Sequence, residues 1–334
     1  MNNLKVGILG GGSWGTTVGS LTSRNADTLL WARNPDTVDE INSSHSNTKY
    51  LPDAKLTSTL QARYTIAETV HGADVVVMAI PSNNFRDVLA QAREHIRPWV
   101  PIVSLTKGLE HGTKMRMTQV IESELPGHPV AALTGPNLAR EIIAGYAAAS
   151  VVATADTTIA NALQKLFRTG LFRVYTNKDV IGCEIGGALK NVIAIAAGMG
   201  DGVGAGENTR SAVITRGLAE LTRLGKAMGG KSATFAGLAG MGDLVATCSS
   251  SQSRNRTVGY HLGKGMALND IIDQMSMVAE GVKTCAVVRE LADDYGIDMP
   301  IAEEVYKVVH QGNTAYDAFK GLLKYESKSE KDPG

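Results

Sequence analysis

A glycine-rich turn near the N-terminus constrains the fold more than any other feature of this sequence. The apolar run Leu4–Leu9 leads directly into Gly10-x-Gly12-x-x-Gly15, and a helical pattern begins at about Trp14. In such a strand–turn–helix unit the first glycine permits the tight turn and the second lets backbone approach a pyrophosphate. The third allows close helix–strand packing, and the helix N-terminus donates N–H groups to the anion. We therefore predict dinucleotide binding at these glycines; a purely structural glycine turn is the alternative.

Further apolar runs alternate with amphipathic segments through the first half of the chain. They are Thr28–Ala32, Val75–Ile80, Ile102–Leu105, Val130–Leu133 and Ser150–Ala153. These runs show little polar alternation, which is typical of strands buried on both faces of a parallel sheet. Repeated strand–helix units predict an α/β Rossmann-like domain over residues 1–177, with a mostly parallel, doubly wound sheet.

The pattern changes near residue 179, where strand-like runs give way to long helical stretches. Examples are Cys183–Met199, Arg210–Met228 and Ala286–Ala292. We predict an all-α second domain over residues 178–334, with the substrate-binding and catalytic groups.

Composition excludes several classes of function. Lys plus Arg equals Asp plus Glu, at 33 each, and aromatic residues make up only 5%. Neither value favours a nucleic-acid or membrane-surface partner. Cys183, Cys248 and Cys285 are far apart, which fits neither a disulfide framework nor a zinc site. With no run of 18 apolar residues and no signal-peptide pattern, we expect a cytoplasmic protein without a metal or a membrane-spanning helix.

The residue after the second apolar run bears on cofactor choice. Dinucleotide-binding domains often carry an acidic residue about 20 positions after the glycines, for the ribose of NAD. Here the run continues as Ala32-Arg33-Asn34. An arginine there can bind the 2′-phosphate of NADPH and stack on adenine, although a solvated strand-end arginine looks the same. We therefore expect NADPH to bind, and NADH is not excluded.

Two further motifs are interpreted as decoys. Residues 11–15 read G-x-S-x-G, the nucleophile elbow of hydrolases, but they follow the first predicted strand, with no earlier strand loop for oxyanion donors. We expect Ser13 to bind a cofactor phosphate instead. Residues 225–232 match the phosphate-binding G-x-x-x-x-G-K-S motif, which requires a preceding strand. Apolar residues at three- and four-residue spacing over 211–224 predict a helix there.

Lys190 and Asn191 are the only polar residues in the centre of an otherwise apolar helical stretch, residues 185–197. A helix that is apolar all round is buried, and a buried lysine requires a partner. Lys190 is therefore either a structural ion pair or snorkelling lysine, or an active-site group whose pKa burial can lower.

Asp243 is the other isolated charge, in a small apolar and glycine-rich stretch. It is a natural partner for Lys190, and it is also a candidate N-cap for a helix starting at Leu244. The polar loop predicted over residues 248–257 contains Ser253-Arg254-Asn255, whose donors suit a phosphate or carboxylate. A solvated loop has similar composition.

Taken together, these segments resemble bacterial-type NAD(P)-dependent glycerol-3-phosphate dehydrogenases. The matching pieces, in order over residues 6–306, are GILGGGSWGTT, LLWARN, SLTKGLE, LTGPNLARE, EIGGALKNVIAIAAGMGDG, ITRGLAE, TFAGLAGMGDLVATC, SRNRTVG, VAEGV and PIAEEVY. Asn137 stands where the family commonly has serine or threonine, yet it still offers a donor and an acceptor.

The resemblance implies roles for individual residues. The cofactor would be bound, besides the glycines, by Ser13, Trp14, Arg33, Lys107, Ala139, Arg254, Val278 and Glu280. The substrate would be bound by Lys107, Gly135, Asn137, Lys190, Asp243, Ser253, Arg254 and Asn255. Lys190 would be the proton donor and acceptor, at a site expected between the domains at the carboxyl ends of the strands.

The implied reaction is reversible, NAD(P)H-dependent reduction of dihydroxyacetone phosphate to sn-glycerol 3-phosphate, which supplies glycerophospholipid synthesis. The expected partner is therefore a small phosphorylated substrate, and a homodimer is compatible with the sequence. The alternatives are a sister dehydrogenase of the 6-phosphogluconate or 3-hydroxyacid type, a non-catalytic NAD(P)-binding sensor, and a nucleotide kinase that uses the second glycine motif.

Overall fold

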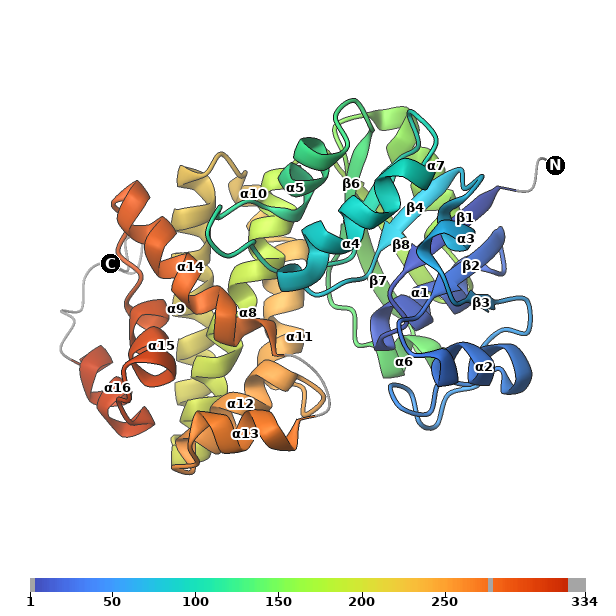
Figure 1. The fold of residues 1–334 in the computed structure, drawn as a ribbon. Helices are drawn as coiled ribbons and strands as arrows, with labels where there is room; N and C mark the ends of the chain where they lie inside the picture. The colour runs from blue at the N-terminus through green and yellow to red at the C-terminus, as the bar shows by residue number, and fades with distance from the viewer. Residues whose placement is uncertain (1–3, 276–278, 324–334) are drawn as a thin grey trace. The chain divides into compact units, whose positions relative to one another are not determined.

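The chain folds into two compact units (Figure 1). The computed structural model describes residues 4–275 and 279–323. One unit contains the residues up to Thr106 together with Met115–Val180, and the other contains Lys107–Lys114 and the residues from Ile181 onward. The short segment Lys107–Lys114 thus groups with the helical unit, although it lies within the range predicted for the first domain.

The first unit is built on an eight-stranded sheet with the order β3-β2-β1-β4-β5-β6-β7-β8. The strands are β1 (Lys5–Leu9), β2 (Asp27–Trp31), β3 (Gln61–Arg63), β4 (Val75–Met78), β5 (Ile102–Ser104), β6 (Val130–Thr134), β7 (Ala148–Ala153) and β8 (Phe172–Asn177). All neighbouring pairs are parallel except β6 and β7. The prediction of a mostly parallel, doubly wound sheet is confirmed.

Helices cover both faces of this sheet (Figure 1). They are α1 (Ser13–Thr22), α2 (Pro35–Ser44), α3 (Ile66–Val70), α4 (Phe85–Ala92), α5 (Met117–Glu124), α6 (Ala139–Ile143) and α7 (Thr157–Phe167), with short 3₁₀ turns at Ser82–Asn84 and Arg93–His95. Ile8 and Val77 pack in one apolar cluster with α1, α2, α6 and α7. Leu9 and Met78 pack in another with α3, α4 and α5. Because neighbouring residues of one strand enter different cores, these strands need apolar side chains at every position.

The strand order reverses between β1 and β4, which both extend from the centre of the sheet. In open α/β sheets, ligands bind outside the carboxyl ends of the strands at such a reversal. The glycine turn follows β1 at this position, so the topology and the motif point to the same place in the first unit.

From Ile181 onward, the regular elements of the described chain are all helices. They are α8 (Val180–Val203), α9 (Gly206–Ala227), α10 (Ser232–Phe235), the π-helix η3 (Leu238–Gly242), α11 (Asp243–Ser249), α12 (Arg254–Gly263), α13 (Leu268–Gln274), α14 (Glu280–Tyr295), α15 (Pro300–His310) and α16 (Ala315–Leu323). An all-α second unit was predicted. The polar loop predicted through residue 257 is wrong in its second half, because α12 already begins at Arg254.

Helix α8 is the central element of this unit. By length and composition it passes as a membrane span, but 89% of its most apolar 18-residue window is buried inside the protein. Small residues let α12 approach its backbone closely: a Cβ on Gly198 would lie 2.1 Å from the carbonyl oxygen of Arg256, and one on Gly259 would lie 2.0 Å from that of Ile195. These contacts are typical of a helix packed in a protein core.

The second glycine motif does not form a phosphate-binding loop. Helix α9 precedes it where a strand is required. A Cβ on Gly225 or Gly230 would lie 2.2 or 2.8 Å from the ring of Phe235, so these glycines serve packing. Interpreting this motif as a decoy was correct, which removes the basis for the nucleotide kinase.

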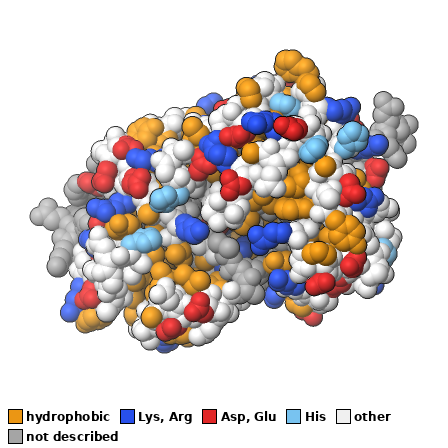
Figure 2. Space-filling model, viewed as in Figure 1, with side chains coloured by type: hydrophobic (Ala, Val, Ile, Leu, Met, Phe, Trp, Pro, Cys, Tyr) orange, Lys and Arg blue, Asp and Glu red, His pale blue; other side chains and the backbone are white. Residues whose placement is uncertain are grey.

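Charged side chains of both signs are interspersed on the face of the molecule shown in Figure 2, and no extended basic patch gathers on that face. This distribution agrees with the equal numbers of basic and acidic residues in the sequence.

Candidate active site

A buried cluster of two lysines and one carboxylate occupies the helical unit. Lys190 Nζ on α8 lies 2.7 Å from Asp243 Oδ1 and donates to Thr247 Oγ1 at 2.6 Å. Lys107 Nζ lies 2.7 Å from the other carboxylate oxygen, Asp243 Oδ2. Lys190 is 6% exposed and Asp243 1%. The predicted pairing of Lys190 with Asp243 is confirmed, and each oxygen of the carboxylate holds one ammonium group.

Close backbone packing brings the two sides of this cluster together. A Cβ on Gly186 of α8 would lie 2.6 Å from the carbonyl oxygen of Ala239 in η3. Lys190 follows Gly186 by four residues, and Asp243 follows Ala239 by four, so each charged residue lies about one turn beyond the contact. A π-helical turn, which is rare and often marks a functional site, carries the chain into α11.

Asp243 is not the N-cap that one interpretation of the sequence suggested. It is the first residue of α11, and the N-cap position is Gly242, which makes no side-chain capping bond. The Asp243 carboxylate instead accepts hydrogen bonds from Lys190 and Lys107. Thr247 lies one turn further along α11, where its hydroxyl donates to the Asp243 carbonyl at 2.6 Å and accepts from Lys190.

Burial perturbs the acid–base behaviour of Lys107. Desolvation lowers its pKa to about 8, opposed by the attraction of Asp243 and assisted by the repulsion of Lys190. An ammonium group that loses its proton near pH 8 is suited to acid–base work or to pH-dependent binding of an anion.

A chain of amide hydrogen bonds runs beside this cluster. Asn191 Nδ2 donates to the Lys107 carbonyl at 3.0 Å, and Asn191 Oδ1 accepts from Asn255 Nδ2 at 3.0 Å. Asn255 Oδ1 accepts from the Gly281 backbone at 2.9 Å. The side chain of Asn255 thus already links α8, α12 and α14, and its second Nδ2 hydrogen and second Oδ1 lone pair are left for a ligand. Sequence reasoning noted Asn191 as polar but assigned it no role.

Ser253 and Arg254 lie at the start of α12. Ser253 is the N-cap, with Oγ accepting from the Arg256 backbone at 3.2 Å. Burial lowers the pKa of Arg254, and the charge of Glu280 at the start of α14 opposes that shift. An arginine at a helix N-terminus, where the helix dipole also favours negative charge, is well suited to an anionic group.

The glycine turn in the first unit has the geometry that its spacing predicts. Gly10 has a φ of +122°, and a Cβ on Gly15 would lie 2.0 Å from the Gly10 carbonyl oxygen. A Cβ on Gly12, by contrast, would meet no described atom within 4 Å. Gly12 is the N-cap of α1 and supplies no side-chain capping bond. The first and third glycines are thus required by the fold, whereas the second leaves space beside a helix N-terminus.

Buried polar atoms without partners mark further positions in the first unit. Within the described residues, Trp14 Nε1 and both side-chain polar atoms of Asn137 are buried with no hydrogen bond. Unpaired buried groups are costly, which suggests that a ligand satisfies them. Gly135, the residue directly after β6, has a φ of +124° that other residues rarely adopt.

The remaining predicted site residues are placed as follows. Ser13 and Ala139 are the first residues of α1 and α6. Arg33 is exposed two residues after β2 and makes no hydrogen bond or ion pair with any residue that the structure describes. Val278 lies outside the described residues. A guanidinium group left in solvent at this position is available to a ligand phosphate.

The three cysteines present no exposed thiol. Cys183, Cys248 and Cys285 are all free and buried. Burial raises the pKa of Cys248 and of Cys285 to about 12, so both are thiols at neutral pH. Among the described residues, no group of three or more His, Cys, Asp or Glu side chains is arranged to hold a metal ion.

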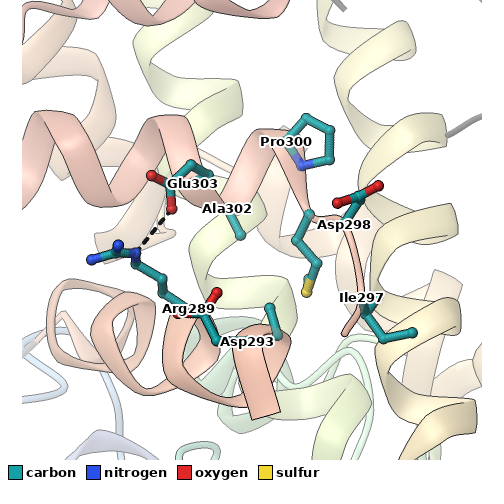
Figure 3. A pocket seen from close by; sticks show the side chains of 9 residues that line it. Arg289, Asp293, Ile297, Asp298, Pro300, Ala302 and Glu303 are labelled. Carbon is teal, nitrogen blue, oxygen red and sulfur yellow. Dashed lines mark ion pairs between the residues drawn. The ribbon is translucent and has the colours of Figure 1, made fainter. Parts of the chain in front are cut away.

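A separate cavity of about 190 Å³ lies between the end of α14 and the start of α15. Figure 3 shows Arg289 and Glu303 paired at its edge, with Arg289 Nε 3.1 Å from Glu303 Oε2. The cavity contains none of the predicted site residues, and its volume is below the range of about 300–1,000 Å³ common for small-molecule sites.

A Rossmann-type sheet with an open glycine turn, followed by a helical unit with a buried lysine, defines the class of two-domain nicotinamide-dependent oxidoreductases. Residues 5–160 match the family model of the N-terminus of NAD-dependent glycerol-3-phosphate dehydrogenase, and residues 179–320 match that of its C-terminus. The chain belongs to this family, which confirms the resemblance found in the sequence.

Individual relatives extend over the whole chain. A Sphingopyxis alaskensis protein named glycerol-3-phosphate dehydrogenase (NAD(P)+) 2 is 62% identical over 331 residues, covering 99% of each chain. Glycerol-3-phosphate dehydrogenase (NAD(P)+) 1 of Mycobacterium tuberculosis is 55% identical, covering 96% of this chain and 94% of its own. The crystal structure of glycerol-3-phosphate dehydrogenase from Coxiella burnetii superimposes with a TM-score of 0.92 at 35% identity, covering 97% and 99% of the two chains.

Proposed function

We propose that this protein reduces dihydroxyacetone phosphate reversibly to sn-glycerol 3-phosphate, with NADPH or NADH as the reductant. The observation that carries the proposal is the buried Lys190, held by Asp243 and Thr247 in a chain of the glycerol-3-phosphate dehydrogenase family. The product is the backbone of glycerophospholipids, so the reaction supplies lipid synthesis.

The residues of the first unit fit a dinucleotide. The open space at Gly12 and the N-terminus of α1 suit the pyrophosphate, with Ser13 at the first helical position. Trp14 Nε1 offers a donor that no described residue uses, and Arg33 would bind the 2′-phosphate of NADPH. Gly10, Gly15 and Ala139 would shape the site, and Lys107, Arg254, Val278 and Glu280 complete the proposed cofactor contacts.

The reduction of a ketone requires a hydride at carbon and a proton at oxygen. The bound nicotinamide supplies the hydride for C2. Lys190, as an ammonium group, donates a hydrogen bond to the C2 oxygen and delivers the proton to it; in the reverse direction it accepts the proton of the C2 hydroxyl. Asp243 and Thr247 fix the position of Nζ. Such a positioned acid–base group contributes roughly 10²–10⁴-fold to rate.

The phosphate of the substrate requires positive charge and N–H donors. Arg254 in the first turn of α12 supplies the fixed charge, with the remaining Asn255 hydrogen, Ser253 and Lys107 nearby in the same unit. Because the pKa of Lys107 is lowered to about 8, its contribution falls as the pH rises through that value. Gly135 and the unpaired amide of Asn137 are the proposed substrate contacts of the first unit.

We further propose a cytoplasmic location and a homodimer. The location is supported by three free, buried cysteines, since oxidising compartments favour disulfides.

The proposal is tested by mixing the purified protein with NADPH and dihydroxyacetone phosphate and following the loss of reduced-cofactor absorbance, with NADH in a parallel reaction. Rapid oxidation that depends on this substrate is expected, and the ratio of the two rates tests the role of Arg33. Cofactor binding without turnover, or preference for 6-phosphogluconate in the oxidative direction, would overturn the substrate assignment in favour of a sensor or a sister dehydrogenase.

A further inference from the structure

Asn47, in the loop between α2 and β3, forms a hydrogen bond with the glycine turn. Its side chain is fully buried. Nδ2 donates to the Gly11 carbonyl at 3.0 Å and to Thr16 Oγ1 at 2.8 Å. The Asn47 carbonyl in turn accepts from the backbone N–H groups of Tyr50 at 3.1 Å and Leu51 at 2.8 Å. A tight loop thus presents one carboxamide to both the turn and the first helical turn of α1.

The contact fixes the orientation of one peptide plane. In a trans peptide the C=O and the following N–H point in opposite directions. Because the Gly11 carbonyl points at Asn47, the Gly12 N–H points away from Asn47. A Cβ on Gly12 would meet no described atom within 4 Å. The Gly12 N–H is therefore held on the side of the turn away from the buried carboxamide, at the uncapped N-terminus of α1.

The hydrogen bond to the Gly11 carbonyl requires the amide nitrogen of Asn47. A carbonyl oxygen accepts only from a donor, so the nitrogen of Asn47 faces Gly11, and a single NH₂ group can serve both acceptors. Within the described residues, Asn47 Oδ1 is buried with no hydrogen bond. The carboxamide is thus placed entirely by its two donated bonds, and an apolar side chain of similar size would leave the Gly11 carbonyl unpaired.

We propose that Asn47 is a positioning residue for the cofactor pyrophosphate: it fixes the Gly11–Gly12 peptide and the first turn of α1 so that their N–H groups are preset for the diphosphate. This inference rests on the proposed dinucleotide binding but not on the choice of substrate. Preset donors spare the ligand the cost of ordering the turn, so the effect is on affinity for the pyrophosphate.

The test compares Asn47→Leu with Asn42→Leu. Asn42 is an exposed control whose carboxamide also bonds backbone in the same unit, to the Ala62 carbonyl at 3.2 Å and from the Ala62 N–H at 2.8 Å, but does not contact the glycine turn. The dissociation constants of NADPH and of adenosine 2′-monophosphate, which lacks the pyrophosphate, are measured for each protein, with thermal unfolding to establish that each is folded.

In Asn47→Leu we expect NADPH to bind about tenfold or more weakly, because the N–H groups that bind its charged diphosphate are no longer held in place. Adenosine 2′-monophosphate should bind within about twofold of its affinity for the wild type. Asn42→Leu should change neither constant. Unchanged NADPH affinity in folded Asn47→Leu, or a parallel loss for both ligands, would overturn the proposal. If the leucine variant does not fold, Asn47→Ser replaces it, because serine is too short to reach both acceptors. The dissociation constants of the two ligands are then compared in the same way for that variant. Because the readout is binding, a protein that binds NADPH but does not reduce dihydroxyacetone phosphate refutes the proposed function and leaves this test intact.

Discussion

The glycine turn of the first unit presents backbone groups to its ligand, whereas the cluster of the second unit presents charged side chains. At Gly12 the site depends on the absence of a side chain, because a Cβ there would occupy space that no described atom fills. At Lys190 the site depends on pairing, because the ammonium group of this 6%-exposed lysine is stable only with its carboxylate and hydroxyl partners. Substitutions should therefore affect the two regions differently: steric changes in the first unit, and unpaired charges in the second.

The largest effect is expected for Asp243→Asn. This change leaves the buried ammonium group of Lys190 and the partly buried one of Lys107 without their shared carboxylate. Breaking a buried ion pair from one side costs about 3–5 kcal/mol of folding stability, and loss of the lysine's orientation should lower turnover about 100-fold or more. Urea unfolding and steady-state kinetics measure the two effects.

Asp201→Asn is the matched control for this prediction. Asp201 is also a buried carboxylate of the helical unit, and it pairs with Arg210 and Arg256, each at 2.7 Å. It should lose comparable stability with a much smaller loss of turnover by the folded protein. Equal losses of turnover in the two variants would show that the lysine cluster has no special role in catalysis.

Gly15→Ala and Gly12→Ala test the same comparison in the first unit. Alanine at Gly15 places Cβ 2.0 Å from a backbone oxygen, so we expect a loss of about 2–4 kcal/mol in the free energy of unfolding. Alanine at Gly12 meets no described atom, so stability should change by less than about 0.5 kcal/mol while NADPH affinity falls about tenfold. Calorimetry with and without NADPH separates the two. A Gly12→Ala variant that binds NADPH normally would show that the space is not a ligand site.

These two regions also differ in how far the sequence predicts them. The glycine spacing follows directly from steric limits on the backbone, so each glycine's role was readable from its position. The Lys190–Asp243 pair was found because isolated charges in apolar stretches require a partner. Thr247 was missed, although its spacing of four residues from Asp243 on a helix could have revealed it.

Elements without such local constraints were missed or misassigned. β3 has only three residues, and β8 alternates buried and exposed side chains, so neither presents the continuous apolar run used to find the other strands. Helix α12 starts inside a polar segment that reads as a loop, and its buried apolar residues, Val258, Gly259 and Leu262, come only after its first turn. Asn47 lies in a polar stretch with no distinguishing pattern, and only the fold brings it to Gly11.

Glu220 provides a smaller test of whether any buried charge of the helical unit affects catalysis. Its carboxylate on α9 accepts from the backbone N–H groups of Ile301 at 2.8 Å and Ala302 at 3.3 Å, in the first turn of α15. Burial raises its pKa to about 7, opposed by these two bonds and by Arg223 and Arg216. Because the folded-state pKa lies above the ordinary value, the folded protein binds the extra proton, and the contribution to stability is lost as the pH rises from about 4.5 through 7.

Glu220→Gln should therefore flatten the pH dependence of unfolding between pH 5 and 8, by on the order of 1–2 kcal/mol, with kcat little changed. Urea titrations of wild type and variant at both pH values measure the difference. An unchanged slope would contradict the raised pKa, and a large loss of kcat would extend the catalytic machinery to α15.

The central claim is that Lys190 transfers the proton while the first unit binds the cofactor independently of it. The direct measurement is kcat together with the NADPH dissociation constant of Lys190→Ala, with Lys226→Ala, an exposed lysine of α9, as the control. We predict that kcat falls about 10²–10⁴-fold in Lys190→Ala while NADPH affinity stays within about twofold of the wild type, and that Lys226→Ala changes neither. Near-normal turnover in a folded Lys190→Ala protein would contradict the account.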